Sequence, residues 1–263
     1  MADKKYTVLL SKRKIVTVVL LMVACLVIGF KLGLNSDVDS PLIWQEEIAK
    51  FQAEDRKHSP KGGSVLFVGS SSIRRWKTLA NDFAPFSVIQ RGFGGARLND
   101  VIYYIEELIF AYQPQAIVLY VGSNDIKPPT PKSPKEVLLL TKLLVDKIHK
   151  RLPSIPVFYI AINPTPKRWH LWPSIQQANN LIKNYTTKQP NLIFIDSAGL
   201  FVNKDQKLIH SLFENDQLHL NQAGYAQWLD VIKPVLMKYL MNEAVQSSSY
   251  IFLDKFLDGG SRL

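Results

Sequence analysis

Short apolar runs and longer stretches with helical spacing alternate along most of this chain. The apolar runs of strand length are 65–68, 87–89, 116–121, 156–162 and 192–195. The stretches with helical spacing are 73–79, 98–111, 134–151, 174–187 and 222–240. Strands that are covered on both faces read as continuous apolar runs. The alternation therefore predicts a three-layer α/β domain around a five-stranded parallel sheet.

We place this domain at residues 63–242. The segments before and after it also have recognisable patterns. Residues 35–62 read as a short linker followed by an amphipathic helix, in which Trp44, Ile48 and Phe51 share one face. Pro234 is expected to kink or split the last helix near Lys233. Residues 243–263 form a C-terminal tail that contains an amphipathic fragment, 250–257.

The N-terminal region has the pattern of a membrane segment. Residues 15–34 are almost entirely apolar and, at about 20 residues, are long enough to cross a bilayer. The preceding segment, 1–14, is basic, so the positive-inside rule places it in the cytoplasm. We therefore expect a single-pass anchor with the α/β domain outside the cytoplasm, periplasmic or extracellular. Two alternatives stay open: a cleaved signal peptide, although 31–36 is a poor cleavage site, and a lipoprotein with Cys25 as the lipidated residue.

Net charge and cysteine content narrow the partners. The chain carries a formal charge of +10, of which +5 lies in residues 1–31, and the remaining excess is spread along the sequence. Such a spread favours a solvated basic surface over nucleic-acid binding. Cys25 is the only cysteine and lies in the apolar segment, so neither a disulfide framework nor a cysteine metal site is expected.

Four short blocks carry the candidate chemistry: Gly69-Ser70-Ser71-Ser72, Gly92-Phe93-Gly94-Gly95, Gly122-Ser123-Asn124-Asp125 and Asp216-Gln217-Leu218-His219. Acyl transfer by a serine needs a nucleophile, a base, a group that orients the base and donors for the oxyanion. Three blocks follow predicted strands and the fourth precedes the last helix. Ligands of open α/β sheets bind beyond the carboxyl ends of the strands. One face of one sheet can therefore collect all four blocks.

The order of these blocks resembles that of the SGNH hydrolases, also called GDSL esterases and lipases. Within them it resembles the compact branch of platelet-activating-factor acetylhydrolase subunits and bacterial lysophospholipases. The resemblance covers about residues 62–242 and implies a flavodoxin-like fold and ester hydrolysis with no metal and no cofactor. The expected partner is an ester substrate, either lipid or glycan, and the oligomeric state is left open.

Carried over by position, the resemblance makes Ser71 the nucleophile. The family's usual Asp and Leu in this block are Ser70 and Ser72, which remain minor candidates. The oxyanion donors would be the backbone N–H groups of Ser71 and Gly95 and the side chain of Asn124. A second departure is Gln90, where the family has Asn.

Asp216 and His219 are the predicted partners of Ser71. At a spacing of three on a turn that enters a helix, both side chains can face the same way. Asp216 can then orient the imidazole while its other nitrogen faces Ser71. Asp146 and His149 have the same spacing, but they lie in a lysine-rich helical stretch that favours a solvated face.

The segment 167–172 contains Trp169, His170 and Trp172 and follows a predicted strand, so these residues are candidates to line the substrate site. Their aromatic rings would suit an acyl chain, a sugar face or a membrane surface, and core packing is the alternative. Esterase activity is the leading hypothesis. Transfer of an acyl group to a glycan and a catalytically silent binding module are its two alternatives.

Overall fold

The computed structural model describes residues 40–258, with side chains described as far as residue 241. The basic segment 1–14 and the expected anchor 15–34 lie outside the described residues. Within 40–258, no helix combines the length and the apolar character that crossing a membrane requires. The chain divides into two units, Met1–Ile43 and Trp44–Leu263.

A five-stranded parallel sheet forms the centre of the second unit, as predicted. The strand order is β2-β1-β3-β4-β5, with every neighbouring pair parallel. The strands are β1 (Val65–Gly69), β2 (Val88–Gly92), β3 (Ala116–Tyr120), β4 (Val157–Ile160) and β5 (Leu192–Ile195). This is the flavodoxin-like order, in which the direction of winding switches between β1 and β3.

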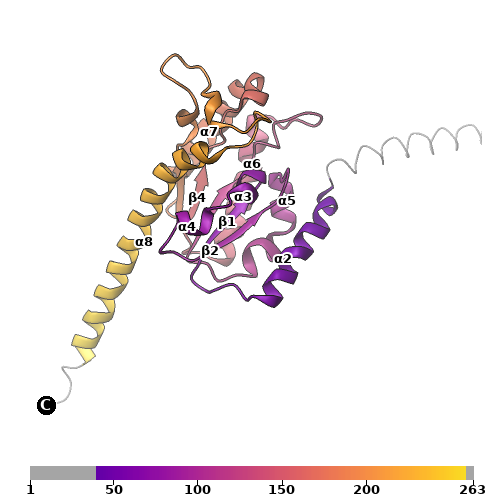
Figure 1. The fold of residues 1–263 in the computed structure, drawn as a ribbon. Helices are drawn as coiled ribbons and strands as arrows, with labels where there is room; N and C mark the ends of the chain where they lie inside the picture. The colour runs from indigo at the N-terminus through magenta and orange to yellow at the C-terminus, as the bar shows by residue number, and fades with distance from the viewer. Residues whose placement is uncertain (1–39, 259–263) are drawn as a thin grey trace, which may run out of the picture. The chain divides into compact units, whose positions relative to one another are not determined.

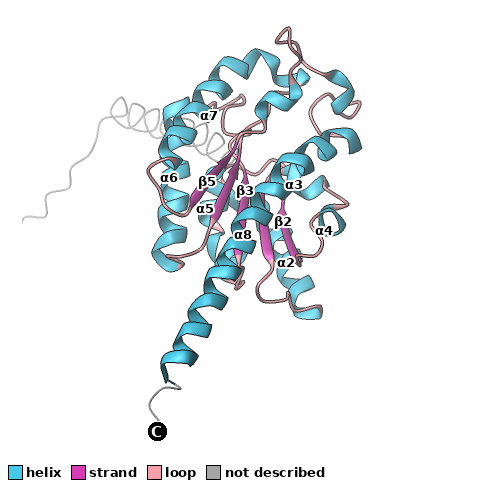
Figure 2. Cartoon of the chain, turned by 90° about the vertical axis from the view of Figure 1, so that its left-hand side faces the viewer, coloured by secondary structure: helices cyan, strands magenta, loops and turns pink. Residues whose placement is uncertain are grey.

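Helices cover both faces of the sheet and give three layers (Figure 2). The helices α2 (Gln45–Lys57), α5 (Leu98–Tyr103), α6 (Pro134–Arg151) and α7 (Trp172–Thr186) pack on one face. The helices α3 (Ser71–Arg75), α4 (Leu79–Asp82) and α8 (Gln222–Asp258) pack on the other. Successive side chains of β1 point to opposite faces of the sheet, so the strand contributes to the apolar core on each face. Leu66 and Val68 belong to the core under α2, α5, α6 and α7, and Val65 and Phe67 belong to the core under α3, α4 and α8.

Strand β2 runs three residues further than its apolar run suggested, because its polar side chains have partners. Gln90 Nε2 donates to the carbonyl oxygens of Ile73 and Trp76, the latter at 3.1 Å. Arg91 pairs with Asp55 and donates from Nε to the hydroxyl of Tyr112. Since Asp55 lies on α2, this partly buried pair also fixes the amphipathic helix against the sheet.

Two of the predicted helices are divided in the structure. The stretch 73–79 is not one helix: α3 and α4 flank Trp76, whose fully buried indole donates to Asp82 Oδ2 at 2.6 Å. The stretch 98–111 is divided into α5 and a π-helical turn, η3 (Glu106–Phe110). Helix α6 has the bounds that were expected.

The expectation that Pro234 splits the last helix is wrong. Helix α8 continues without a break from Gln222 to Asp258, into the predicted tail (Figure 1). Proline removes a hydrogen bond to the carbonyl four residues earlier, here that of Asp230. Pro234 and Asp230 are both exposed, so water can reach that carbonyl. The buried side chains of Trp228, Ile232 and Leu236 hold the helix on the sheet at both sides of the proline.

Candidate active site

The four sequence blocks meet at the carboxyl end of the sheet, next to the switch between β1 and β3. Ser71 is the first residue of α3, directly after β1, and its side chain is half-buried. Gly69 precedes it at a point where β1 approaches β3 so closely that a Cβ would collide with the carbonyl oxygen of Tyr120. The tight strand-to-helix turn therefore requires glycine there.

Ser71, His219 and Asp216 form a continuous chain of hydrogen bonds. The distance from His219 Nε2 to Ser71 Oγ is 2.9 Å, and that from His219 Nδ1 to Asp216 Oδ2 is 2.6 Å. The 216–219 segment is a turn, and it is held in place because Gln217 O accepts from the backbone N–H of Lys167 at 2.9 Å. Asn221 then caps α8, accepting from the N–H of Gly224 at 3.1 Å.

Asp216 is built to stay ionised. Burial alone would raise its pKa, but hydrogen bonds from the His219 ring and from the backbone N–H groups of His219 and Leu218 outweigh it. They hold the pKa of Asp216 well below its usual range. Arg75 Nη1 adds a positive charge 3.5 Å from Oδ2.

The charge on Asp216 decides where the imidazole proton lies. An ionised carboxylate only accepts, so His219 Nδ1 carries the hydrogen and donates it to Asp216. Nε2 is then the free acceptor of the neutral ring, and the Ser71 hydroxyl donates to it. This is the arrangement in which a serine can lose its proton to a base during attack.

The two other predicted oxyanion residues lie beside each other. Asn124 is buried and donates from Nδ2 to the carbonyl of Ala96 at 3.1 Å. Gly95, the neighbour of Ala96, has a φ of +80°, a conformation that favours glycine, and a Cβ there would lie 3.4 Å from the Trp44 ring. Among the described residues, nothing accepts a hydrogen bond from the Gly95 N–H, so this group is available as a donor.

Arg168 is a site residue that the sequence patterns did not single out. Its guanidinium donates from Nη1 to the carbonyl of Ser123 and from Nη2 to Oδ1 of Asn124, each at 3.1 Å. Burial lowers its pKa. No carboxylate among the described residues pairs with it, so its charge stays uncompensated beside Asn124. Its only sequence signal is its position in the segment 167–172.

A small cavity of about 20 Å³ lies between these groups. Its polar lining includes Ser71, Asn124, Arg168 and His219, and its apolar lining includes Ile175 and Leu218. Ser72 also touches it, but Ser70 does not, because Ser70 is buried with its N–H bonded to Tyr120 O. In the described part of the chain, no three His, Cys, Asp or Glu side chains come together as a metal site requires.

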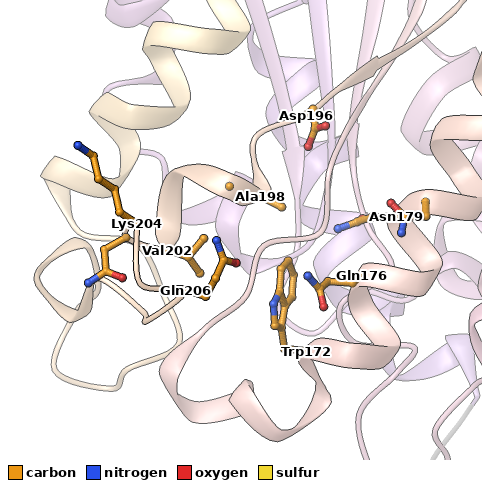
Figure 3. A pocket seen from close by; sticks show the side chains of 11 residues that line it. Trp172, Gln176, Asn179, Asp196, Ala198, Val202, Lys204 and Gln206 are labelled. Carbon is orange, nitrogen blue, oxygen red and sulfur yellow. The ribbon is translucent and has the colours of Figure 1, made fainter.

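The aromatic candidates lie further out. Trp169 and His170 are exposed and are not among the residues that line this cavity. Trp172 stacks on Trp169, with ring centroids 6.0 Å apart, and lines a larger neighbouring cleft instead (Figure 3). His149, which has the same spacing from Asp146 as His219 has from Asp216, is half-buried on α6. Its Nε2 lies 3.2 Å from the carbonyl oxygen of Ile155, away from the site.

Comparison with known proteins agrees with this fold. Residues 62–227 match the model of the GDSL-like Lipase/Acylhydrolase family. The matched segment contains all four blocks and more than half of the chain. The chain therefore belongs to the GDSL-like lipase/acylhydrolase family, whose members are ester hydrolases. No curated protein matches the sequence significantly.

Solved structures with the same fold cover most of the chain. A Streptococcus pneumoniae protein described as a platelet activating factor is 19% identical, with a TM-score of 0.64, over 79% of this chain and 99% of its own. A GDSL-like lipase from Bacteroides thetaiotaomicron is 18% identical, with a TM-score of 0.62, over 73% and 98%. A carbohydrate esterase family 3 protein from Talaromyces cellulolyticus is 16% identical, with a TM-score of 0.55, over 68% and 98%.

Proposed function

We propose that this protein is a metal-independent serine esterase that hydrolyses carboxylic esters through Ser71, His219 and Asp216. The observation that carries the proposal is the chain of hydrogen bonds from Ser71 through His219 to the ionised Asp216. Ser71 Oγ attacks the ester carbonyl carbon and passes its proton to His219 Nε2. His219 then gives this proton to the departing alcohol oxygen as the ester C–O bond breaks, and water releases the acyl group by the same route in reverse.

Negative charge develops on the carbonyl oxygen during the attack, and hydrogen-bond donors that are already in place stabilise it. The backbone N–H groups of Ser71 and Gly95 and the second amide hydrogen of Asn124 are the donors we propose. Asn124 Nδ2 uses one hydrogen on Ala96 O, which leaves the other available. The nearby positive charge of Arg168 also favours negative charge on the carbonyl oxygen.

A short acyl group, acetyl above all, suits this site best. The cavity beside Ser71 has a volume of about 20 Å³, room for little more than one water molecule. A long acyl chain would have to lie outside it. Solved structures with the same fold include an acetyl esterase and an acetyl xylan esterase, which is consistent with this preference.

A fluorophosphonate probe and a small ester together test the proposal. The wild-type chain should react covalently with the probe and hydrolyse p-nitrophenyl acetate. Ser71→Ala should lose both properties, because the hydroxyl that bonds His219 is gone. Ser70→Ala and Ser72→Ala are matched controls within the same block and should keep a measurable part of the activity. A dead Ser70→Ala beside an active Ser71→Ala would show the assignment of the nucleophile to be wrong. A wild-type chain that neither labels nor hydrolyses would favour the silent binding module.

We also propose that residues 15–34 tether the catalytic domain to the membrane, on the outside of the cytoplasm. The proposal rests on the apolar segment and the basic residues that precede it. Terminal mass analysis of the mature protein and protease access on spheroplasts test it. A mature N-terminus near Asn35 would replace the anchor with a signal peptide, and a lipid on Cys25 would replace it with a lipoprotein.

A further inference from the structure

A second, larger cleft is lined by residues of α7 and of the segment that follows β5 (Figure 3). Trp172 and Gln176 of α7 lie on one side of it, and Val202 and Gln206 lie on the other. Its volume is about 590 Å³, within the range of small-molecule sites. Nothing in the triad or the oxyanion donors uses this cleft.

Residues that line the cleft lie near residues of the Ser71 cavity at two places. On α7, Ile175 lines the cavity and the next residue, Gln176, lines the cleft. After β5, the Ser197 hydroxyl accepts a hydrogen bond of 3.2 Å from the side-chain amide of Asn163, which lines the cavity, while the next residue, Ala198, lines the cleft. The two linings thus adjoin on α7 and after β5, which suits a substrate whose ester lies at Ser71 and whose alcohol part extends into the cleft.

The lining of the cleft is mostly polar, and it carries only one charge that is not neutralised by a partner within the part of the chain that the structure describes. Its apolar side chains are those of Trp172, Ala198 and Val202, and most of the others carry amides. The carboxylate of Asp196 is paired with Lys183 at 2.7 Å, so Lys204 is the one lining charge without a partner among the described residues. A lipid acyl chain would bury its methylene groups against polar atoms here, which is unfavourable.

Several amides of the cleft are free to bind a ligand. The side chains of Gln176, Asn180 and Gln206 form no hydrogen bond with any described residue. The amide of Asn203 is not free, because its Oδ1 accepts hydrogen bonds from the backbone N–H groups of Asp205 and Lys207. These bonds close the turn that carries Gln206. The free amides thus project from two ordered walls, the helix α7 and this turn.

Trp172 supplies a flat apolar surface beside these amides. Its indole is half-buried and stacks on Trp169 at an interplanar angle of 16°, which restricts its motion. A sugar ring has an apolar face of C–H groups and a rim of hydroxyl groups that both donate and accept. An aromatic plane with amides around it matches both features.

We propose that this cleft binds a sugar unit in the alcohol part of the substrate, so that the natural substrate is an acylated, uncharged oligosaccharide rather than a lipid. The inference rests on the proposed esterase function, and it names the substrate class of the same site. The Ser71 cavity accepts the acyl group while the neighbouring cleft holds the glycan that carries it.

Two assays with the full-length chain test this inference. In the first, binding of xylotetraose, cellotetraose and chitotetraose is followed by tryptophan fluorescence. The wild type should bind at least one of them, and Gln176→Ala and Gln206→Ala should each weaken that binding about 3- to 10-fold, the cost of a lost hydrogen bond. Trp172→Ala should weaken it about tenfold or more, and the two glutamine variants keep the test valid if this variant folds poorly.

In the second assay, the acetylated form of the bound oligosaccharide is compared with p-nitrophenyl acetate and with lysophosphatidylcholine micelles. The glutamine variants should raise KM for the acetylated oligosaccharide alone and leave p-nitrophenyl acetate unchanged. Gln177→Ala is the matched control, because Gln177 is the exposed neighbour of Gln176 on α7 but does not line the cleft.

The outcomes separate this inference from the proposed function. A wild type that binds none of the three oligosaccharides overturns the sugar cleft, as does an equal loss for Gln177→Ala. If the glutamine variants instead impair turnover of the lysophospholipid, the cleft binds lipid and the inference is wrong. Oligosaccharide binding without hydrolysis of any ester would leave the cleft standing and refute the esterase.

Discussion

Arg168 and Asn124 are joined by a hydrogen bond of 3.1 Å, in which the guanidinium Nη2 donates to the amide Oδ1. The bond fixes which way the amide faces, because Oδ1 is committed to Arg168 and one Nδ2 hydrogen to Ala96 O. The remaining Nδ2 hydrogen is the one available to a developing oxyanion. A positive charge on the carbonyl side of an amide also polarises it and strengthens its N–H groups as donors.

Replacing Arg168 should therefore act on kcat more than on KM. Asn124→Ala removes an oxyanion donor directly and should lower kcat for p-nitrophenyl acetate about 10²- to 10³-fold. Arg168→Met leaves the donor but not its orientation, so the loss should be smaller, and Arg168→Lys should recover part of it. Combined with Asn124→Ala, the Arg168→Met change should cost little more, because both act on one group.

Lys127 provides the control for charge alone. Burial and the nearby charges of Arg168 and Arg97 lower the pKa of Lys127, but no hydrogen bond links Lys127 to the described residues. Lys127→Met should then leave kcat nearly unchanged. If Lys127→Met and Arg168→Met were equally slow, the general positive potential would matter and the orientation of Asn124 would not.

His219→Ala should reduce turnover by several orders of magnitude. A serine hydroxyl without a base is a poor nucleophile at neutral pH. Asp216→Asn should lose a similar amount or less, since it spoils the tautomer of His219 while the oxyanion donors persist. Steady-state kinetics with p-nitrophenyl acetate measure both losses.

His149→Ala is the matched control for these variants, because the Asp146–His149 spacing copies that of Asp216–His219. In the structure Asp146 Oδ1 accepts from the Tyr185 hydroxyl at 3.3 Å, and His149 contacts Ile155 O, so the two do not form a pair. Activity should stay close to that of the wild type. Near-native turnover in His219→Ala would remove the histidine from the mechanism.

The sequence was sufficient for those elements whose local pattern decides the structure. The strand β5 and the helix α6 have the predicted bounds, since an apolar run and a capped amphipathic stretch leave few alternatives. Pro234 and Trp76 show where such reasoning ends. Solvent access to one carbonyl and burial of one indole are properties of the assembled domain, not of neighbouring residues.

The candidate site also contains one contact that the sequence could predict and others that it could not. Asp216 and His219 are three residues apart, so their pairing could be expected from spacing. Arg168 lies 44 positions from Asn124, and only the packing of the segment after β4 against the end of β3 brings them together. The proposed sugar cleft depends likewise on two separate stretches, α7 and residues 196–206, which no local pattern connects.

Activity should fall on acidification because His219 loses its free acceptor when it is protonated. The pKa of Asp216 lies well below its usual range, so this carboxylate stays ionised in mildly acidic solution and is not the group that titrates. The profile of kcat/KM against pH for p-nitrophenyl acetate measures the effect. A profile that stays flat as the pH falls, or one that rises, would contradict a histidine base.

Asp125, the residue after Asn124, should make the stability of the fold depend on pH. This carboxyl is fully buried, and both its oxygens face the backbone N–H of Leu98 at 3.1 and 3.3 Å. Burial raises the pKa of Asp125 to about 7, from an ordinary value of 3.8, while the Leu98 N–H and Lys132 oppose the shift. The folded state therefore binds this proton more tightly than the unfolded chain does. Its stabilising contribution is complete below the ordinary pKa and is lost as the pH rises through about 7.

Asp125→Asn should remove this pH dependence, because asparagine matches the neutral acid in shape and does not titrate. Urea unfolding of both chains, at about pH 4.5 and about pH 8 around the range set by the two pKa values, measures it. The free energy of unfolding of the variant, relative to the wild type, should be higher at the upper pH. Taking this difference cancels the other titrating groups, including Asp100, whose pKa burial also raises. An equal effect of the substitution at both pH values would mean that Asp125 keeps its charge in the folded protein and that the Leu98 N–H outweighs burial.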